Sequence, residues 1–342
     1  MNTRARRSVA LVTALALAVP AAVGTSAAVA AQDEGKFCEG TDIVFFPGGT
    51  EGGGFETVVY NGAKAAEAAF GPAVAYQWSD WLPETMLQQF SEAVATQPDG
   101  IAVMGHPGDD AFKPLIDDAV AQGIIVTVMN TELPLVQEEY APVGTGYVGQ
   151  TLFKAGNDLA NETIKRSGLQ PGDKVFVWGL LAQEGRGERT KGILAGFEDA
   201  GWVRDDDLIY LEMTNEINAQ SSLGVPVYVG IASDHPDLKA AVFDHGEMTA
   251  TAQNYLEAAG QGPEDIYVSG FDLAVPTVEA VRSGYTDLVI DQQQWLQGFE
   301  AVLQICLTDK YQFSGLHINT GGGFLDSSNV DALAELVELQ IR

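Results

Sequence analysis

Short apolar runs alternate with longer amphipathic stretches along almost the whole 342-residue chain. The runs are rich in β-branched and aromatic side chains, which is typical of buried strands. The stretches repeat their apolar residues at helical spacing and carry helix-boundary signals, such as Pro83 at a start and Gly123 after an end. This alternation predicts an α/β fold built on parallel sheets.

Two successive series of strands and helices, of about equal length, predict two doubly wound lobes. Strands are expected at residues 43–46, 74–76, 100–104, 124–129, 141–144, 175–178, 208–211, 240–243, 266–268 and 288–290, with an extended segment at 316–318. Helices are expected at residues 55–70, 83–96, 109–122, 148–166, 189–200, 226–233, 248–259, 275–283 and 295–308, with a last helix capped by Asn329.

Polar side chains follow several of the predicted strands. Asp272 follows the strand at 266–268 within Gly270-Phe271-Asp272, and Gln292 follows the strand at 288–290. His106 and His245 also come directly after strands. Open α/β sheets bind ligands at the carboxyl ends of their strands, so these residues, with Phe271, are candidates for a ligand site.

A glycine-rich loop at residues 48–54 lies between the first strand and the first helix. Such a loop permits close approach of a ligand to a helix N-terminus, but the Gly-Lys-Ser/Thr of a phosphate loop is absent. A dinucleotide fingerprint is only nominally present, and a flexible turn is the alternative. Phe55, directly after the loop, either stacks on a ligand or packs in the core.

The sequence offers little for catalysis. It has no Gly-x-Ser-x-Gly elbow and no pair of histidines or cysteines at the spacing of metal ligands. The side chains of Asp244-His245-Gly246-Glu247 are adjacent in sequence, so they are poorly placed to bind one metal ion together. No catalytic residue, metal or cofactor is predicted. Arg186 and Arg189 stand out among few basic residues, and Arg189 is a candidate donor to vicinal hydroxyls or a carboxylate, with a surface salt bridge as the alternative.

Residues 1–30 have the pattern of a secretory signal peptide: arginines, an apolar stretch, and Ala28-Val29-Ala30. A membrane anchor is the less favoured alternative. Export predicts a location in the periplasm or on the extracellular face of the cell envelope. The only two cysteines, Cys38 and Cys306, then suggest a disulfide, with two buried thiols as the alternative.

The chain is strongly acidic, with a formal net charge of −29. Loss of Arg4, Arg6 and Arg7 with the signal peptide lowers it to about −32. Such a surface repels nucleic acids and anionic lipids, so neither is expected as a partner.

An ordered set of short motifs resembles periplasmic sugar-binding proteins of the ribose/galactose type, the solute receptors of ABC importers. The resemblance spans residues 41–331 and rests on the following motifs: Gly123 to Asn130, Tyr147-Val148-Gly149, Arg189 to Ile193, Ser269-Gly270-Phe271-Asp272, and Asp291-Gln292 ahead of Gln297-Gly298.

The resemblance implies a type I periplasmic-binding-protein fold whose two lobes are joined by three hinge crossings. The first lobe would comprise residues 41–144 plus 293–319, and the second residues 147–290 plus 321–342. It further implies a monomer that catalyses nothing, binds one monosaccharide or small polyol between its lobes, and delivers it to an ABC permease in the membrane.

The family's binding positions fall on Phe55, Glu56, Asn130, Arg189, His245, Asp272 and Gln292. Glu56 and His245 depart from the family pattern, in which an aromatic residue and asparagine are usual, so the sugar stays unspecified. Trp78, Trp81 and Trp295 are further candidates to cover the apolar face of a sugar ring, with packing in the core as the alternative for each.

Two other functions remain open at this point. A receptor that presents a sugar or autoinducer-2 to a membrane signalling protein would use the same cleft. A secreted hydrolase or oxidoreductase would need a nucleophile–base pair or a cofactor motif, and neither is visible.

Overall fold

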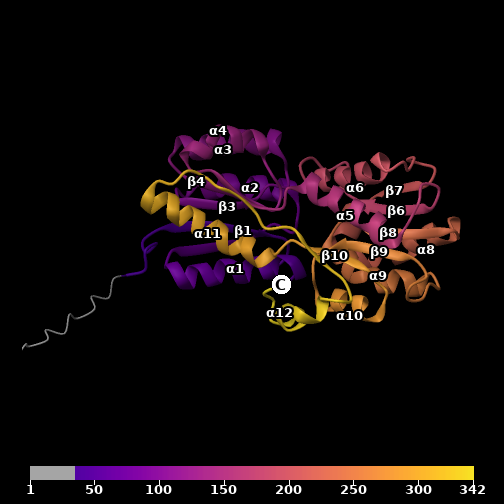
Figure 1. The fold of residues 1–342 in the computed structure, drawn as a ribbon. Helices are drawn as coiled ribbons and strands as arrows, with labels where there is room; N and C mark the ends of the chain where they lie inside the picture. Colours follow the sequence, from indigo (N-terminus) through magenta and orange to yellow (C-terminus); the bar gives the residue numbers. More distant parts are fainter. Residues whose placement is uncertain (1–34) are drawn as a thin grey trace, which may run out of the picture. The chain divides into compact units, whose positions relative to one another are not determined.

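The computed structural model describes residues 35–342, so the predicted signal peptide lies outside the described residues. These residues form two six-stranded sheets, each with helices on both faces (Figure 1). The prediction of two doubly wound α/β lobes with parallel sheets is confirmed.

The sheet of the first lobe is parallel throughout, with strand order β11-β5-β4-β3-β1-β2. The strands are β1 (Asp42–Gly48), β2 (Ala73–Trp78), β3 (Gly100–Met104), β4 (Ile125–Met129), β5 (Gly146–Gly149) and β11 (His317–Asn319). The central strand β3 is buried along its full length, as expected of an apolar run covered on both sides. Its register aligns Met104 with Met129, so β3 and β4 end level with one another.

Helices α1 (Gly54–Phe70) and α11 (Gln294–Tyr311) pack together against the first sheet, and α2 (Pro83–Ala95), α3 (Asp109–Ala121) and α4 (Pro134–Tyr140) form the other layer (Figure 1). Glycines bring α1 and α11 close together. A Cβ added to Gly62 would lie 1.9 Å from the Trp295 carbonyl oxygen, and one added to Gly298 would lie 1.9 Å from that of Val59.

The sheet of the second lobe has the order β12-β10-β9-β8-β6-β7. Its strands are β6 (Lys174–Gly179), β7 (Leu208–Glu212), β8 (Leu238–Phe243), β9 (Tyr267–Phe271), β10 (Leu288–Asp291) and β12 (Gly323–Leu325). This sheet is parallel except at its edge, where the short strand β12 pairs antiparallel with β10.

Helices α5 (Leu152–Ser167) and α6 (Gly187–Asp199) cover one face of this sheet, and α8 (Val225–Asp234), α9 (Gly246–Ala258) and α10 (Val275–Ser283) cover the other. The short helices α7 (Asn215–Ala219) and α12 (Ala334–Glu338) complete the lobe. Glycines also bring α5 and α6 close together, as they do α1 and α11 in the first lobe. A Cβ on Gly156 would lie 2.0 Å from the Arg189 carbonyl oxygen, and one on Gly192 would lie 2.0 Å from that of Phe153.

The chain passes between the two sheets three times. It leaves the first sheet after β5, returns after β10 through α11, and passes from β11 to β12 near the carboxyl terminus. Each sheet has its own apolar core, with Phe45 and Val128 among the core residues of the first lobe and Val177 and Phe243 among those of the second.

Two predictions of local structure are wrong. Residues 141–144 are not a strand: Ala141–Val143 form a short 3-10 helix, which Pro142 favours at its start and Gly144 ends with a φ of 111°. The strand is β5, which overlaps the first two residues of the helix predicted at 148–166, and α5 begins only at Leu152.

Asn329 does not cap a last helix with its side chain. Its Nδ2 donates to the Phe324 carbonyl oxygen at 3.1 Å and its Oδ1 accepts from the Asp326 amide at 2.9 Å, so the side chain instead ties the loop after β12. The helical residues that follow divide into a 3-10 turn (Val330–Ala332) and α12.

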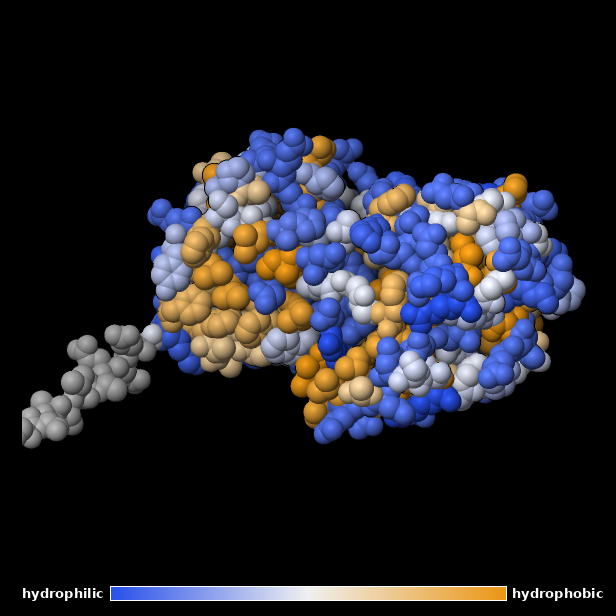
Figure 2. All heavy atoms as spheres, in the orientation of Figure 1, coloured by the Kyte–Doolittle hydropathy of each residue, from blue (hydrophilic) through white to orange (hydrophobic). Residues whose placement is uncertain are grey.

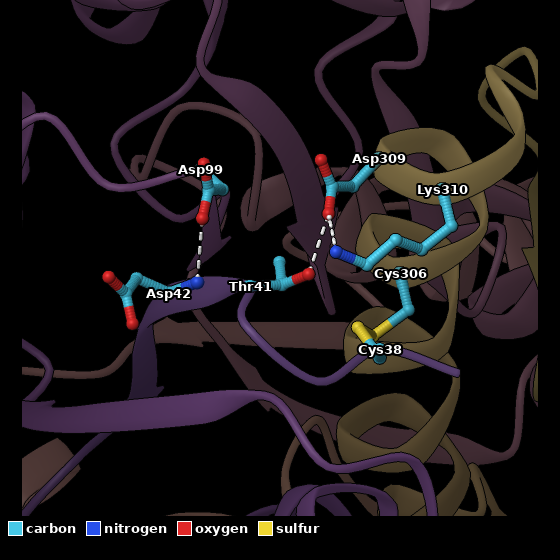
Figure 3. The surroundings of a disulfide bond; sticks show 7 residues. All are labelled: Cys38, Thr41, Asp42, Asp99, Cys306, Asp309 and Lys310. Atoms are coloured by element: carbon cyan, nitrogen blue, oxygen red, sulfur yellow. Dashed lines mark hydrogen bonds and ion pairs between the residues drawn. A yellow bond between two sulfur atoms is a disulfide. The ribbon is translucent and has the colours of Figure 1, made fainter. Parts of the chain in front are cut away.

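A disulfide joins Cys38, just before β1, to Cys306 in α11 (Figure 3). Next to it, the Thr41 hydroxyl donates to Asp309 at 2.6 Å, and Lys310 pairs with the same carboxylate at 3.0 Å. These contacts fasten the segment before β1 to α11 at the amino end of the first strand.

The surface in view is mostly hydrophilic, with a hydrophobic area over α1 and α11 (Figure 2). At the carboxyl end of α1, Ala68 and Ala69 are exposed and Phe70 is half-buried. None of the helices within residues 35–342 is long and apolar enough to cross a membrane.

Candidate functional site

A cavity lies at the carboxyl ends of strands from both lobes. Its volume is about 80 Å³, several times the roughly 10–15 Å³ that one water molecule needs. The first lobe contributes residues that follow β1, β2, β3 and β4, and the second lobe contributes residues that follow β6, β7, β8, β9 and β10. The cavity is lined by Gly54, Phe55, Glu56, Trp81, His106, Asn130, Leu180, Gln183, Arg186, Arg189, Asn218, His245, Gly246, Glu247, Asp272, Leu273, Ala274, Gln292 and Gln294.

Asn130 and Asp272 occupy equivalent positions in the two lobes. Asn130 follows β4 with a φ of 61°, and Asp272 follows β9 with a φ of 67°. Short polar side chains tolerate this left-handed conformation better than other non-glycine residues. Each backbone amide donates to a neighbouring strand, Asn130 to Val148 at 3.0 Å and Asp272 to Ile290 at 2.8 Å. The same local geometry therefore presents a carboxamide from one lobe and a carboxylate from the other.

Gln292 links these two side chains across the lobes. Its Oε1 accepts from Asn130 Nδ2 at 3.0 Å and from Arg189 Nη2 at 3.1 Å. Its Nε2 donates to Asp272 Oδ2 at 2.9 Å. Because Gln292 is only 1% exposed, this network is fixed in the protein interior and orients the residues that face the cavity.

Two buried arginines form the wall of the second lobe. Arg186 pairs with Asp244, whose other oxygen accepts from the Thr190 hydroxyl. Burial acts to raise the pKa of Asp244, but Arg186 and Arg189 outweigh it and hold the pKa below its usual range. Arg189 donates to the Asp244 carbonyl oxygen at 3.2 Å, and its guanidinium lies 4.3 Å from the centre of the Phe271 ring. Both arginines are thereby held rigidly against the cavity.

Several buried polar atoms among the residues that line the cavity have no hydrogen-bond partner in the protein. They are Asp272 Oδ1, Arg186 Nη1, Arg189 Nε, His245 Nδ1 and Gln294 Oε1. Burying an unsatisfied polar group costs roughly 1–3 kcal/mol, and more when the group is charged. A ligand that both donates and accepts hydrogen bonds would satisfy such a set.

The two histidines of the cavity are neutral. Burial lowers the pKa of His245 to about 4, assisted by the charge of Arg186. Burial, with Arg186 and Arg189, also lowers the pKa of His106 well below its usual value. A neutral imidazole both donates and accepts one hydrogen bond, which suits a hydroxyl.

Burial raises the pKa of each of the three acidic groups of the cavity. Burial raises the pKa of Glu56 to about 7 and that of Asp272 to about 6. It also raises the pKa of Glu247. The cavity therefore carries less negative charge than its three carboxyl groups would have in water.

Aromatic rings line the side of the cavity that belongs to the first lobe. Phe55 and Trp81 meet edge to face with ring centres 5.7 Å apart, and Trp81 lies 4.9 Å from the His106 ring. Trp78 instead packs against Tyr60 and Trp295 against Phe299, and neither lines the cavity.

The structure brings together eight of the nine side chains predicted at the site: Phe55, Glu56, His106, Asn130, Arg189, His245, Asp272 and Gln292. Phe271 is the exception. Its ring is fully buried in the core between the sheet and α5 and α6, where it supports Arg189 from behind. That the eight bind a ligand stays a prediction.

Several residues that line the cavity were not predicted, among them Leu180, Gln183, Asn218, Glu247, Leu273 and Gln294. The sequence did contain a signal for two of them. Glu247 lies in the first turn of the helix after His245, and Gln294 continues the glutamine run after Asp291. Asn218 belongs to α7, a helix of five residues with no clear apolar period.

The chain matches known binding proteins over most of its length. The family model of the periplasmic binding protein domain matches residues 43–306. The xylose/arabinose-binding protein XylF of Sulfolobus acidocaldarius is 27% identical over 272 residues, which cover 75% of this chain and 64% of that protein. A D-ribose/D-allose-binding protein of Pseudomonas aeruginosa is 25% identical over 210 residues, which cover 60% of this chain and 62% of that protein. The chain thus spans less than two thirds of the length of these curated relatives.

A solved structure has the same fold. It is a carbohydrate transporter from Acidothermus cellulolyticus 11B in complex with myo-inositol, with a TM-score of 0.73 and 23% identity over 88% of this chain and 99% of that one. Since the family model alone accounts for far more than half of the residues, the chain belongs to the periplasmic binding protein family.

Proposed function

We propose that this protein is an exported receptor that captures a monosaccharide or small polyol between its lobes and catalyses no reaction. We further propose that it delivers this ligand to an ABC-type permease in the membrane. The family and the names of the relatives support this reading, since they include a xylose/arabinose-binding and a D-ribose/D-allose-binding protein.

One observation carries the proposal: the residues that line one cavity include aromatic rings and several side chains whose buried donors and acceptors lack partners in the protein. Asp272 Oδ1 is an unused acceptor, Arg186 Nη1 an unused donor, and His245 Nδ1 serves in either role according to its tautomer. Sugar hydroxyls donate and accept, and the C–H faces of the ring pack on aromatic side chains. A ligand that lacks one hydroxyl would leave one of these groups unpaired, which gives selectivity.

The proposed roles differ between the lobes. Asp272, Arg189, His245 and Gln292 would bind hydroxyls, while Phe55 would cover the ring. Asn130 would contribute to both the ligand and the interlobe network, because its Nδ2 already donates to Gln292 and Gln297. Glu56 and His106 would lie at the edge of the ligand.

A thermal-shift screen of pentoses, hexoses and polyols tests the proposal. A ligand present at 100 times its dissociation constant stabilises the folded state by about 2.7 kcal/mol, so a true ligand raises the melting temperature clearly above that of unrelated sugars. If no compound in the screen shifts the melting temperature, the sugar assignment is wrong. A shift with autoinducer-2 alone would favour a signalling receptor instead.

A further inference from the structure

The glycine loop, residues 48–54, is packed against side chains from both lobes, a feature that ligand binding alone does not explain. Side chains occupy the space that a Cβ would need at several of its glycines. A Cβ on Gly48 would collide with the ring of Trp81, and one on Gly53 would lie 1.9 Å from Glu56 Oε1. Glu56 Oε1 also accepts from the Thr50 amide at 2.8 Å. Glu56 and Trp81 therefore hold the loop in shape from within the first lobe.

A third side chain reaches the loop from the second lobe. Glu247 lies in the first turn of α9, and its Oε1 would be 2.7 Å from a Cβ on Gly54. Burial raises the pKa of Glu247, and the backbone N–H of Gly54 acts in the opposite direction by favouring the ionised carboxylate. Glycine at position 54 thus leaves room for a carboxylate of the opposite lobe.

Helix α1 has no side-chain cap at its N-cap position, although Glu56 places a carboxyl group in its first turn. Its N-cap residue is Gly53, and no side chain caps the first turn from the usual position. The first amides of a helix lack partners within the helix and attract negative charge. From the opposite lobe, Glu247 brings close to the first turn of α1 an acceptor oxygen of the kind that a local Ser, Asp or Asn supplies in other helices.

The start of α3 repeats this arrangement. Its N-cap is Gly108, with a φ of 86° and no side-chain cap. Here Glu184, from the loop after β6 of the second lobe, passes so close that a Cβ on Gly108 would lie 2.9 Å from Glu184 Cγ. Two helices of the first lobe therefore begin at glycines that contact glutamates of the second.

We propose that the glycine loop takes part in a contact between the lobes, in which Glu247 of the second lobe caps α1 of the first across the cleft. Glu184 of the second lobe makes a second contact of this kind at Gly108. Such contacts form only when the lobes approach. They favour the closed arrangement whether or not a ligand is bound, and so they raise the apparent affinity for any ligand that needs closure.

Hydrogen exchange of the ligand-free protein tests this contact directly. In Glu247→Ala, amides in a peptide covering residues 50–57 should exchange about threefold to tenfold faster than in the wild type, because α1 loses its cap. Glu257→Ala is the matched control, since Glu257 lies in the same helix at its far end. It should leave exchange at residues 50–57 unchanged. Equal exchange in the wild type and Glu247→Ala would overturn the proposal.

A second variant tests the same contact without removing the glutamate. Alanine favours a helix more than glycine does, so Gly54→Ala by itself should slow exchange in the first turn of α1. If Glu247 occupies the space beside Gly54, the same change should speed exchange, and the effect should vanish or reverse in the Glu247→Ala background. Slower exchange in Gly54→Ala alone would contradict the proposal. Because no ligand is present, either outcome is independent of whether the protein binds a sugar.

Discussion

Asp272 combines burial, an unused acceptor atom and a rare backbone conformation. Its side chain is 5% exposed, Oδ2 accepts from Gln292, and Oδ1 has no partner. Alanine would be strained at a φ of 67°, but asparagine tolerates that conformation and keeps the shape of the side chain. Asparagine is therefore the substitution that separates ligand binding from folding.

We expect Asp272→Asn to weaken sugar binding by about tenfold to a hundredfold while leaving the melting temperature of the ligand-free protein within a few degrees. A hydrogen bond to a charged group contributes about 1.5–3 kcal/mol, and each 1.4 kcal/mol corresponds to a factor of ten. Asp206→Asn, at an exposed position of the second lobe, is the control. Unchanged affinity in the Asp272 variant, measured by calorimetry, would refute the role of this carboxylate.

The raised pKa of Asp272 predicts how affinity depends on pH. Burial raises this pKa to about 6, so the carboxylate is mostly protonated at pH 5 and ionised at pH 7.5. If the ionised form accepts the hydroxyls, affinity should rise between pH 5 and 7 with a midpoint near 6. Asp272→Asn should lack that component of the titration. An affinity that falls over this range would contradict the assignment.

The stability of the ligand-free protein should change in the opposite direction. The unfolded chain loses the Asp272 proton near pH 3.8 and the folded protein near 6, so the unfolded state binds fewer protons between these values. The contribution of Asp272 to the free energy of unfolding therefore falls as pH rises from about 4 to 6. Glu56, with a pKa raised to about 7, extends this loss to higher pH.

At the residue scale, the sequence predicts which side chains follow strands but not which way every side chain points. Phe271 and Asp272 are neighbours, yet one ring is in the core and the next carboxylate faces the cavity. Trp81 reaches the cavity through a turn in which Asp80 and Trp81 have φ of 51° and 56°. Because this turn contains no glycine, the sequence gives no sign of it. The sequence therefore offers no reason to prefer Trp81 over Trp78 or Trp295 as a residue that lines the cavity.

At the scale of the elements, the helix pairs α1–α11 and α5–α6 help to position residues that line the cavity. Each pair crosses at reciprocal glycines, and the α5–α6 crossing places Gly156 against the backbone of Arg189. The crossing therefore sets the position of a side chain that lines the cavity. Regular apolar periods predict such helices well, but the short helices α4 and α7 and the edge strand β12 lack a period long enough to detect.

Gly192→Ala should destabilise the protein by about 1–3 kcal/mol, since its Cβ would lie 2.0 Å from the Phe153 carbonyl oxygen and force α5 and α6 apart. Gly230→Ala is the matched control. Gly230 lies within α8 with nothing within 4 Å of an added Cβ, so alanine there should be neutral or stabilising. Chemical denaturation measures the free energy of unfolding of both variants. An unchanged free energy of unfolding in Gly192→Ala would show that α5 and α6 can move apart at little cost.

The disulfide fastens the start of the first lobe to α11, at the amino end of β1 and so away from the cavity at its carboxyl end. Replacing Cys38 and Cys306 together by alanine should lower the free energy of unfolding by about 2–5 kcal/mol and leave ligand affinity unchanged. Free-thiol titration of the unfolded, unreduced wild type should find no thiol. Two titratable thiols would show that the bond is absent in solution.

At the scale of the whole molecule, the two lobes contribute different groups to one cavity. The first lobe supplies the aromatic rings together with Glu56, His106 and Asn130, and the second supplies the arginines, Asp272 and His245. The sequence predicts two lobes because the strand–helix series repeats, and it predicts the site because ligand crevices form at strand ends. It does not reveal the contacts between lobes, such as Glu247 with Gly54, because those depend on how two separately folded surfaces meet.

Isothermal titration of the purified protein with a panel of pentoses, hexoses and polyols tests the central claim most directly. Any co-purified ligand is first removed by unfolding and refolding with the disulfide intact. We predict saturable binding of at least one of these compounds at one site per chain, weakened in Asp272→Asn and unchanged in Asp206→Asn. Absence of heat with every sugar and polyol, from protein that refolds fully, would contradict the account.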